Sequence, residues 1–262
     1  MKTLRALFSA TLCALLAAAS LAAHAGRSCE SRPPTADAVE RSMALAERAA
    51  KTLDATGAQV VVLARAGQNL NEYGLRYSHL GFAYRDTNGW RVVHKLNQCG
   101  SARASIYRQG LGEFFMDDLY RYEAALVVPT AEVQARLAPA LADNARVAQL
   151  NTPAYSVVAY PWAVTYQQSN QWAIETLAMT QDPAASTRER AQAWLKLQGY
   201  QPTTLHISPF KRLGARVGTA NVAFDDHPNE KRFSDRVETV TVDSVFAWLN
   251  RSGLGGPVQV IR

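Results

Sequence analysis

Three short segments rich in β-branched and aromatic residues follow one another closely, and this succession most constrains the fold. Residues 58–64 (AQVVVLA) form a continuous apolar run, which is typical of a strand buried on both faces. Residues 76–84 (RYSHLGFAY) and 90–96 (WRVVHKL) are joined by the sequence RDTNG, whose Asn-Gly end favours a hairpin turn. A further strand is expected at residues 122–128. The chain is therefore predicted to form an antiparallel β-meander.

Helical segments flank these strands. Thr35 is a suitable N-cap for a helix from Ala36 to about Leu53, where apolar residues fall near one face. The pattern predicts helices over residues 36–53, 112–120, 130–150, 165–179, 187–197 and 242–250. A β-meander packed against helices indicates the α+β class.

The first 25 residues have the three-part organisation of a secretory signal peptide. A basic start precedes an almost wholly apolar stretch over residues 6–23, and residues 23–25 (AHA) supply a cleavage site. We predict a signal peptide over residues 1–25 and a single mature domain over residues 26–262, which is periplasmic or secreted. An uncleaved anchor is the alternative, because about 20 apolar residues can cross a bilayer. No later segment is apolar enough, so we expect no stable transmembrane segment after cleavage.

The composition and the absence of certain motifs limit the kinds of partner that the protein is expected to bind. The chain is 48% hydrophobic and 19% charged, which excludes a disordered polymer. The 28 Lys and Arg against 22 Asp and Glu give +6, and loss of the two basic residues in the signal peptide leaves 6 − 2 = +4. This surplus is too small to indicate nucleic-acid binding. The sequence has no C-x-x-C, H-E-x-x-H, Walker or dinucleotide-binding motif, so we expect no cofactor and no metal site.

Two polar segments lie near the C-terminus. Residues 225–228 (DDHP) are expected to form a turn rather than a metal site, with the aspartates pairing to nearby cations, namely Lys231, Arg232 or Arg236. A second group is expected to form a solvated basic face: Lys211, Arg212 and Arg216.

Two cysteines remain in the predicted mature chain, Cys29 and Cys99, because Cys13 leaves with the signal peptide. In an oxidising compartment such a pair most simply forms a disulfide. The bridge would close a loop of about 70 residues and contribute on the order of 4 kcal/mol in the chain-entropy model. A thiolate nucleophile at Cys99 is the alternative.

Two histidines lie on predicted strands. Alternation places His79 on one face with small residues, which leaves room for another group to approach the imidazole as a general base requires. His94 shares a face with apolar residues of the next strand. If Asn88-Gly89 forms a two-residue turn, His94 lies opposite Ala83 and is too far from His79, whereas a six-residue loop places the two histidines face to face. Burial in the core is the alternative role for either residue.

A third candidate opens the helix predicted at residues 165–179. Thr165 and Gln168 fit a capping box, which places Ser169 in the first turn. At helical spacing Ser169 lies on the same inward row as Trp172. A serine needs an adjacent base to become a nucleophile, and the alternative is an ordinary first-turn serine.

These pieces together resemble the circularly permuted papain-like amidases and acyltransferases (NlpC type), in which a histidine strand precedes an N-C-x-x-aromatic helix. The resemblance implies that His79 is the base, His94 the residue that orients it, and Ser169 the nucleophile, with Gln168 and Trp172 as ligand-binding neighbours. It also implies a permuted papain-like layout. The chain departs from that pattern because a serine replaces the cysteine, and a hydroxyl ionises far less readily than a thiol.

A closer resemblance covers nearly the whole mature chain. The phrases GRSCE, VVLARAG, YSHLGFA, HKLNQC, YQQSNQWAIE, FDDHP and TVDSVFAWL are similar to the exported bacterial family called domain of unknown function 2145. That family implies a serine at this position and both cysteines within matched phrases, as a structural disulfide would have.

Two functions are therefore expected from the sequence. One is an exported pseudoenzyme of papain-like fold that binds an envelope ligand or protein partner. The alternative is a serine-dependent amidase or acyltransferase acting on cell-wall peptides or acyl substrates, with Ser169, His79 and His94 at its centre. The first is favoured because no carboxylate orienter or oxyanion hole is evident in the sequence.

Overall fold

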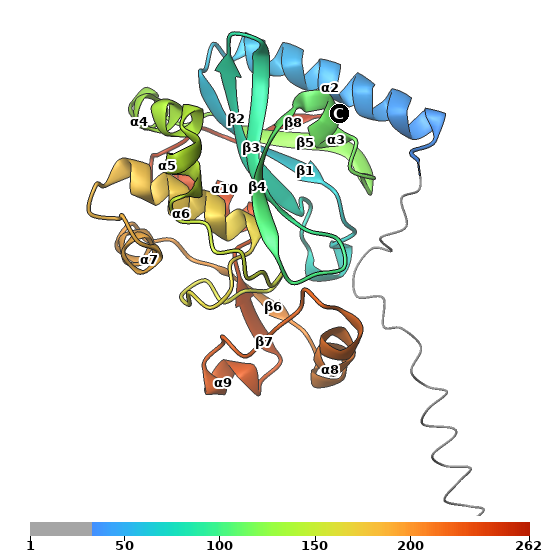
Figure 1. Cartoon of the computed structure of the whole chain (residues 1–262), viewed down its shortest axis with the longest axis vertical. Coiled ribbons are helices and arrows are strands. Elements are labelled where there is room, and N and C mark those ends of the chain that lie inside the picture. Colours follow the sequence, from blue (N-terminus) through green and yellow to red (C-terminus); the bar gives the residue numbers. More distant parts are fainter. Residues whose placement is uncertain (1–32) are drawn as a thin grey trace, which may run out of the picture.

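The computed structural model describes residues 33–262, and Figure 1 shows their arrangement. The predicted signal peptide and Cys29 lie outside the described residues, so the cleavage site and the bridge from Cys29 to Cys99 stay predictions. Within residues 33–262, every helix is too short or too polar to span a lipid bilayer.

An antiparallel six-stranded sheet forms the centre of the molecule, with the strand order β4-β3-β2-β1-β5-β8. Its strands are β1 (Val60–Ala66), β2 (His79–Asp86), β3 (Gly89–Asn97), β4 (Ala104–Gly110), β5 (Arg121–Val127) and β8 (Gln259–Ile261). The first four strands are sequential neighbours, so the predicted meander is confirmed. The α+β class is confirmed with it.

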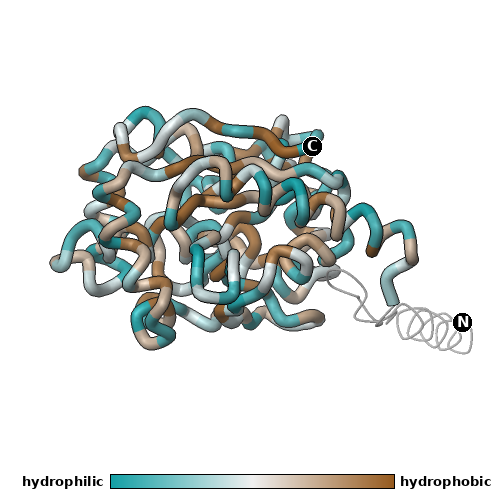
Figure 2. The backbone as a smooth tube through the Cα atoms, turned by 90° about the horizontal axis from the view of Figure 1, so that it is seen from above, coloured by the Kyte–Doolittle hydropathy of each residue, from teal (hydrophilic) through white to brown (hydrophobic). Residues whose placement is uncertain are grey.

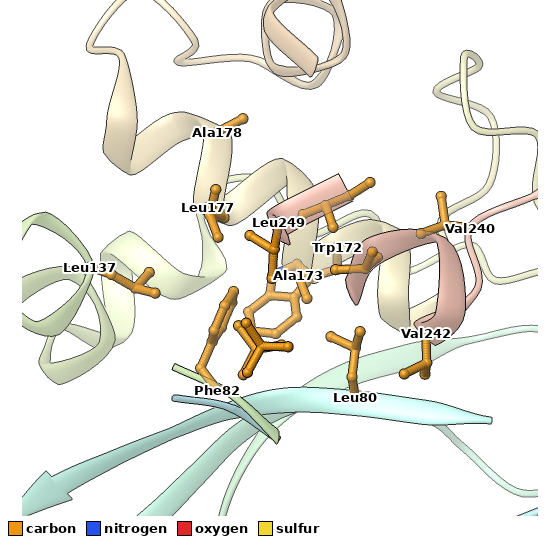
Figure 3. Packing of buried hydrophobic residues seen from close by; sticks show 14 of the residues in the cluster. Leu80, Phe82, Leu137, Trp172, Ala173, Leu177, Ala178, Val240, Val242 and Leu249 are labelled. Carbon is orange, nitrogen blue, oxygen red and sulfur yellow. The ribbon is translucent and has the colours of Figure 1, made fainter. Parts of the chain in front are cut away.

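Helices cover both faces of the sheet. One face packs against α2 (Ala36–Ala55) and α3 (Leu111–Phe115), and the other packs against α4 (Ala131–Ala142), α6 (Ser169–Gln181) and α10 (Val242–Arg251). The second face contains the larger core, in which Trp172 lies on Phe82 (Figure 3). Each large apolar side chain buried there contributes roughly 1.5–3 kcal/mol to folding. Figure 2 shows hydrophobic stretches concentrated in the interior and hydrophilic ones at outer turns.

A smaller unit at one end of the molecule, residues 203–239, is called the cap below (Figure 1). It contains a two-stranded sheet and two helices: β6 (Thr203–His206), α8 (Pro209–Gly218), α9 (Asn229–Arg232) and β7 (Arg236–Thr239). Its small core extends to the short η1 turn (Asn71–Tyr73) and to Val158. The remaining helices are α5 (Asn144–Ala148) and α7 (Arg188–Leu197).

Helix α6 begins later than predicted. The N-cap is Gln168, whose side-chain oxygen accepts a hydrogen bond from the backbone N–H of Asn170, so the predicted capping box at Thr165 is wrong. The segment before Gln168 is held in an irregular path by buried polar groups described below. Ser169 still occupies the first turn, as predicted.

The helix predicted over residues 130–150 is two helices. Asp143 has an extended backbone conformation and separates α4 from α5. Its carboxylate accepts hydrogen bonds from the backbone N–H groups of Ala145 and Arg146, so the side chain caps a new helix instead of continuing the old one. The helix predicted at residues 112–120 is the shorter α3.

Candidate active site

The β2–β3 hairpin determines how the two histidines meet. Asp86 pairs with Gly89 across a two-residue turn, Thr87-Asn88, and Phe82 pairs with Val93. Continuing this register places His94 opposite Gly81. Both registers expected from the sequence are therefore wrong, because the turn lies one residue earlier than Asn88-Gly89.

Gly81 allows contact between the two histidines. Nε2 of His79 lies 2.8 Å from Nδ1 of His94, although the residues are diagonal rather than directly opposite. A Cβ atom at position 81 would lie 2.8 Å from the Cβ of His94 and 2.8 Å from the carbonyl oxygen of Val93. The space that small neighbours leave beside His79 is thus occupied by the His94 ring.

Hydrogen bonds fix the protonation of both rings. Nε2 of Gln109 donates to the carboxylate of Glu113 (3.0 Å), so the Gln109 oxygen faces Nε2 of His94 at 2.7 Å. His94 must therefore carry its proton on Nε2, and its Nδ1 accepts the proton of His79 Nε2. In the neutral His79 ring, Nδ1 then has a free lone pair. The Glu113–Gln109–His94 chain thus determines the tautomer of His79 and leaves its free lone pair on Nδ1.

Both histidines are neutral near pH 7. Burial lowers the pKa of His79 well below its usual range, and the Arg65 guanidinium lowers it further. Burial, again assisted by Arg65, lowers the pKa of His94 to about 3. The ring of Phe114 from α3 packs edge-on against His94 at 5.1 Å between centroids, which excludes water from that side.

Ser169 lies near His79 but comes from α6, on the opposite face of the sheet. The Asn170 carboxamide oxygen accepts a hydrogen bond from the backbone N–H of Leu80 (3.0 Å), and its nitrogen donates to the carbonyl oxygen of Val240 (3.2 Å). The first bond joins the first turn of α6 to the start of β2, and the second joins it to the residue after β7. Ser169 and His79 consequently border the same cavity.

Ser169 has a different immediate partner from the one expected. Its side chain interacts with the hydroxyl of Tyr155, an interaction that offsets part of the rise in the pKa of Tyr155 caused by burial. Within the described part of the chain, no hydrogen bond joins Ser169 to His79. The structure therefore brings all three predicted catalytic residues together but links only His79 and His94 directly.

The two predicted ligand-binding residues lie in different places. Gln168 borders the cavity, and its carboxamide nitrogen donates to Thr239 Oγ1 (2.8 Å) and to the carbonyl oxygen of Val240 (2.5 Å). Trp172 lies in the core, where its indole N–H donates to the carbonyl oxygen of Val147. Gln168 fixes the end of β7 against α6, and Trp172 does not border the cavity.

The cavity has a volume of about 290 Å³ and two kinds of wall. Hydroxyl, carboxamide and imidazole groups line the end formed by β2, Tyr155 and α6. Apolar side chains line the end formed by the cap and the η1 region, including Tyr73, Leu75, Val158, Leu205, Ile207 and Phe224. This division suits a ligand with one polar and one apolar part.

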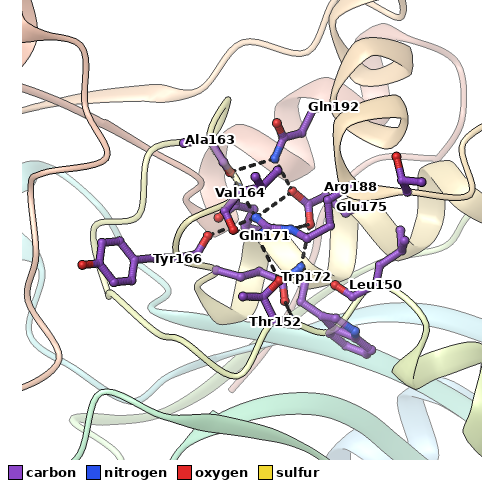
Figure 4. Close-up of polar contacts among 12 residues, drawn as sticks. Leu150, Thr152, Ala163, Val164, Tyr166, Gln171, Trp172, Glu175, Arg188 and Gln192 are labelled. Atoms are coloured by element: carbon purple, nitrogen blue, oxygen red, sulfur yellow. Dashed lines mark hydrogen bonds and ion pairs between the residues drawn. The ribbon is translucent and has the colours of Figure 1, made fainter.

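A buried polar network supports the segment that leads into α6 (Figure 4). Arg188 pairs with Glu175 at 2.8 Å and donates to backbone carbonyl oxygens of the preceding loop, while Gln192 donates to the other Glu175 oxygen. Gln167 also donates to Glu175 (2.6 Å) and accepts a hydrogen bond from Lys95. Burial, with the nearby Arg188 charge, lowers the pKa of Lys95 to about 7. Sequence reasoning missed this network.

The DDHP turn has a structural role. The imidazole of His227 contacts the carboxylate of Asp226 (2.9 Å) and donates to the carbonyl oxygen of Glu238 (3.1 Å). Asp226 accepts the backbone N–H of Tyr160 (2.8 Å) and Asp225 accepts the hydroxyl of Tyr166 (3.3 Å), so the predicted pairing of the aspartates with nearby cations is wrong. Among the described residues, no group of three or more His, Cys, Asp or Glu side chains could hold a metal ion.

The fold and the site define a class: an α+β protein with a histidine pair on a central antiparallel sheet and a helix-opening serine at the same cavity. Residues 52–249 match the family described as "Uncharacterized protein conserved in bacteria (DUF2145)", and the chain belongs to this family. This agrees with the resemblance noted in the sequence.

No curated protein matches the chain. Among solved structures, the chain is similar to the metalloprotein yiiX (DUF1105) from Escherichia coli O157:H7, with 10% identity, a TM-score of 0.43, and coverage of 78% of this chain and 96% of that chain. A similarity at this level carries no argument about the site, and the permuted papain-like layout stays a prediction.

Proposed function

We propose that the protein binds, in the cavity beside Ser169 and His79, an envelope ligand that has an apolar portion and a polar end. This proposal rests on the division of the cavity lining into a polar end and an apolar end. The volume, about 290 Å³, is at the lower end of the range of roughly 300–1,000 Å³ for ligand pockets, so the ligand is modest in size. An acyl chain against the cap, with its carbonyl end near Ser169, fits both walls.

The signal-like first 25 residues support a site of action outside the cytoplasm. Acyl groups attached to lipids or to cell-wall components are available in that compartment. We therefore assign the ligand to the acyl-bearing molecules of the envelope.

Binding can be measured with a fluorescent fatty acid, cis-parinaric acid, added to the mature protein. Val222 is half-buried and borders the cavity, so Val222→Trp should fill part of it and weaken binding at least tenfold. The matched control is Val258→Trp at an exposed position, which should bind the probe as the unmodified protein does. Thermal unfolding should first establish that both variants fold. Equal binding by the two variants would contradict the proposal.

A second candidate function, acyl transfer, is favoured by the proton arrangement of His79. In this reaction Nδ1 of His79 accepts the proton of the Ser169 hydroxyl while Oγ forms a bond to the substrate carbonyl carbon. The leaving group then takes that proton from His79, and water or another acceptor cleaves the acyl-serine ester. The backbone N–H of Asn170 is already bonded to the Gln168 side chain, but the other N–H groups of the first turn of α6, those of Ser169 and Gln171, could stabilise the oxyanion.

A fluorophosphonate probe distinguishes catalysis from binding alone. If Ser169 is a working nucleophile, the probe should label the protein, and Ser169→Ala and His79→Ala should each abolish labelling. The control is Ser78→Ala, because the Ser78 hydroxyl also borders the cavity but already accepts hydrogen bonds from the backbone N–H groups of Gly67 and Gln68. Fatty-acid binding without labelling would identify the protein as a binding module.

A further inference from the structure

The outer surface of the cap combines exposed apolar side chains with arginines. Phe210 and Leu213 on α8 are 89% and 64% exposed, and Phe233 after α9 is 78% exposed. A depression of about 250 Å³ lies among these side chains, and its lining includes Arg212, Arg216, Arg232, Leu213 and Phe233. We call the surface formed by these residues and Phe210 the cap patch. Large apolar side chains gathered on a soluble domain mark an interaction surface.

The charge of the cap patch is not balanced locally. The lining of the depression contains three arginines and no carboxylate. Among the described residues, two carboxylates near the patch pair with lysines, Glu72 with Lys211 and Glu238 with Lys231, and the carboxylate of Asp235 contacts the imidazole of His206. Glu230 on α9 is exposed and does not line the depression. Arg232 instead lies over the ring of Phe233, at 5.6 Å from the guanidinium carbon to the centroid. Arg212 is buried and donates to the backbone carbonyl oxygens of Lys231 and Ser234, so its place on the solvated basic face predicted from the sequence is wrong. The arginines of the patch that can meet anions are Arg216, which is exposed, and Arg232, which is half-buried.

We propose that the cap patch docks on the surface of a bilayer that contains anionic phospholipids. Charge complementarity selects this occupant: guanidinium groups match phosphate head groups, while Phe210, Leu213 and Phe233 reach the boundary of the acyl chains. Two signals, one apolar and one electrostatic, are what stable association with a membrane surface requires.

The patch lies directly outside the cavity. Phe224 borders both the depression and the cavity, and Ala215 borders the cavity from α8 while Leu213 borders the depression. A docked cap therefore holds the cavity next to the source of acyl groups. Docking does not rest on the proposed function, because the residues of the cap patch bind the bilayer whether or not the cavity is occupied.

Vesicle flotation of the mature protein tests docking. The protein should float with vesicles of equal parts phosphatidylglycerol and phosphatidylcholine, and should not float with pure phosphatidylcholine. The variants Phe210→Ser with Leu213→Ser, and Arg216→Ser with Arg232→Ser, should each weaken binding at least tenfold, since each arginine near an anionic surface contributes about fivefold. Raising the salt concentration should weaken the binding of the unmodified protein.

Matched controls lie on α7, away from the cap. Leu197→Ser changes a side chain that is 82% exposed, and Arg190→Ser changes an exposed arginine; both should leave vesicle binding unchanged. No flotation with anionic vesicles, or equal binding by the patch and control variants, would overturn the proposal. A dimer in solution that dissociates in the Phe210→Ser, Leu213→Ser variant would also overturn it, because the patch would then fit a second copy of the chain. Loss of fatty-acid binding with retained flotation would affect the proposed function alone.

Discussion

At the scale of single residues, the contact between His79 and His94 depends on a glycine, Gly81. Because Gly81 has no Cβ, the His94 ring can lean diagonally across the hairpin and contact His79. The sequence places the two histidines on neighbouring strands but leaves two registers open, one with the histidines face to face and one with them too far apart for contact. It does not specify the turn, and a shift of one residue changes which side chains lie opposite each other.

Gly81→Ala should break the contact between the histidines. The added methyl group would overlap the Cβ of His94 and the backbone of Val93, which cannot move easily within a sheet. We expect a loss of about 1–3 kcal/mol in the free energy of unfolding, measured by urea denaturation. Gly214→Ala is the control, because nothing lies within 4 Å of the added atom and alanine is the better helix former. A Gly81→Ala protein as stable as the control would contradict this account.

The stability of the protein should fall as the pH falls below about 6.5. The folded His94 has a pKa of about 3, against 6.5 for an ordinary histidine, so between these values the unfolded chain binds a proton that the folded chain does not. Folding is thus most favourable above pH 6.5. The full penalty, reached near pH 3, is on the order of 5 kcal/mol, and roughly 2 kcal/mol of it appears between pH 6.5 and pH 5. His79 acts in the same direction.

Urea denaturation at pH 7.5 and pH 5 measures this dependence. His94→Gln should reduce the difference in unfolding free energy between the two conditions by roughly 2 kcal/mol. His206→Gln is the control, because that histidine is exposed on the cap. An identical dependence on pH in the unmodified protein and in His94→Gln would contradict a buried neutral imidazole.

At the scale of elements, hydrophobic periodicity predicted the strands and helices that pack against a core. The strands β1, β2, β3 and β5 and the helices α2, α7 and α10 lie close to their predicted positions, because each buries a continuous or amphipathic apolar face. Strand β4 was missed: it is at the edge of the sheet, and its sequence ASIYRQG has no apolar alternation. Helix α8 was also missed: its large apolar side chains Phe210 and Leu213 are exposed and are not part of a buried core.

The start of α6 could not be predicted from local sequence. It depends on Arg188 and Glu175, whose pairing holds the preceding loop out of a helical path. The nearest signal in the sequence is an ionisable residue, Glu175, within an otherwise inward-facing helical segment. A buried charge requires a partner, but nothing in the spacing identifies Arg188 as that partner.

Glu175→Gln should destabilise the protein strongly. It removes the carboxylate from Arg188, which would then be a buried cation without its anion, and such losses cost about 3–5 kcal/mol. The matched control is Glu132→Gln, which breaks the exposed pair with Arg136 and should cost less than about 1 kcal/mol. Urea denaturation measures both. Equal losses of unfolding free energy in the two variants would contradict a large contribution of the Arg188–Glu175 pair to stability.

At the scale of the whole molecule, the cavity lies where the larger core, on the α6 face of the sheet, meets the small core of the cap. The α+β class and the β-meander were predictable because they follow from the order of the elements. The cavity was not predictable, because its walls come from segments far apart in the chain, from Gln68 to Thr241.

The predicted bridge from Cys29 to Cys99 would tie the start of the mature chain to the end of β3. Mass spectrometry of the unreduced mature protein should find the two cysteine peptides linked and a chain beginning at Gly26. Reduction should lower the free energy of unfolding, by up to about 4 kcal/mol in the chain-entropy model. Two alkylatable thiols in the unreduced protein would contradict the bridge.

The histidine pair belongs to the layer of α2 and α3, whereas Ser169 belongs to the layer of α6. The distance between the histidine pair and Ser169 is therefore set by how two separate cores pack on the sheet. In a genetic selection for activity, a defect caused by a change in one layer should be suppressed by compensating changes in the other, at positions that contact neither histidine nor serine.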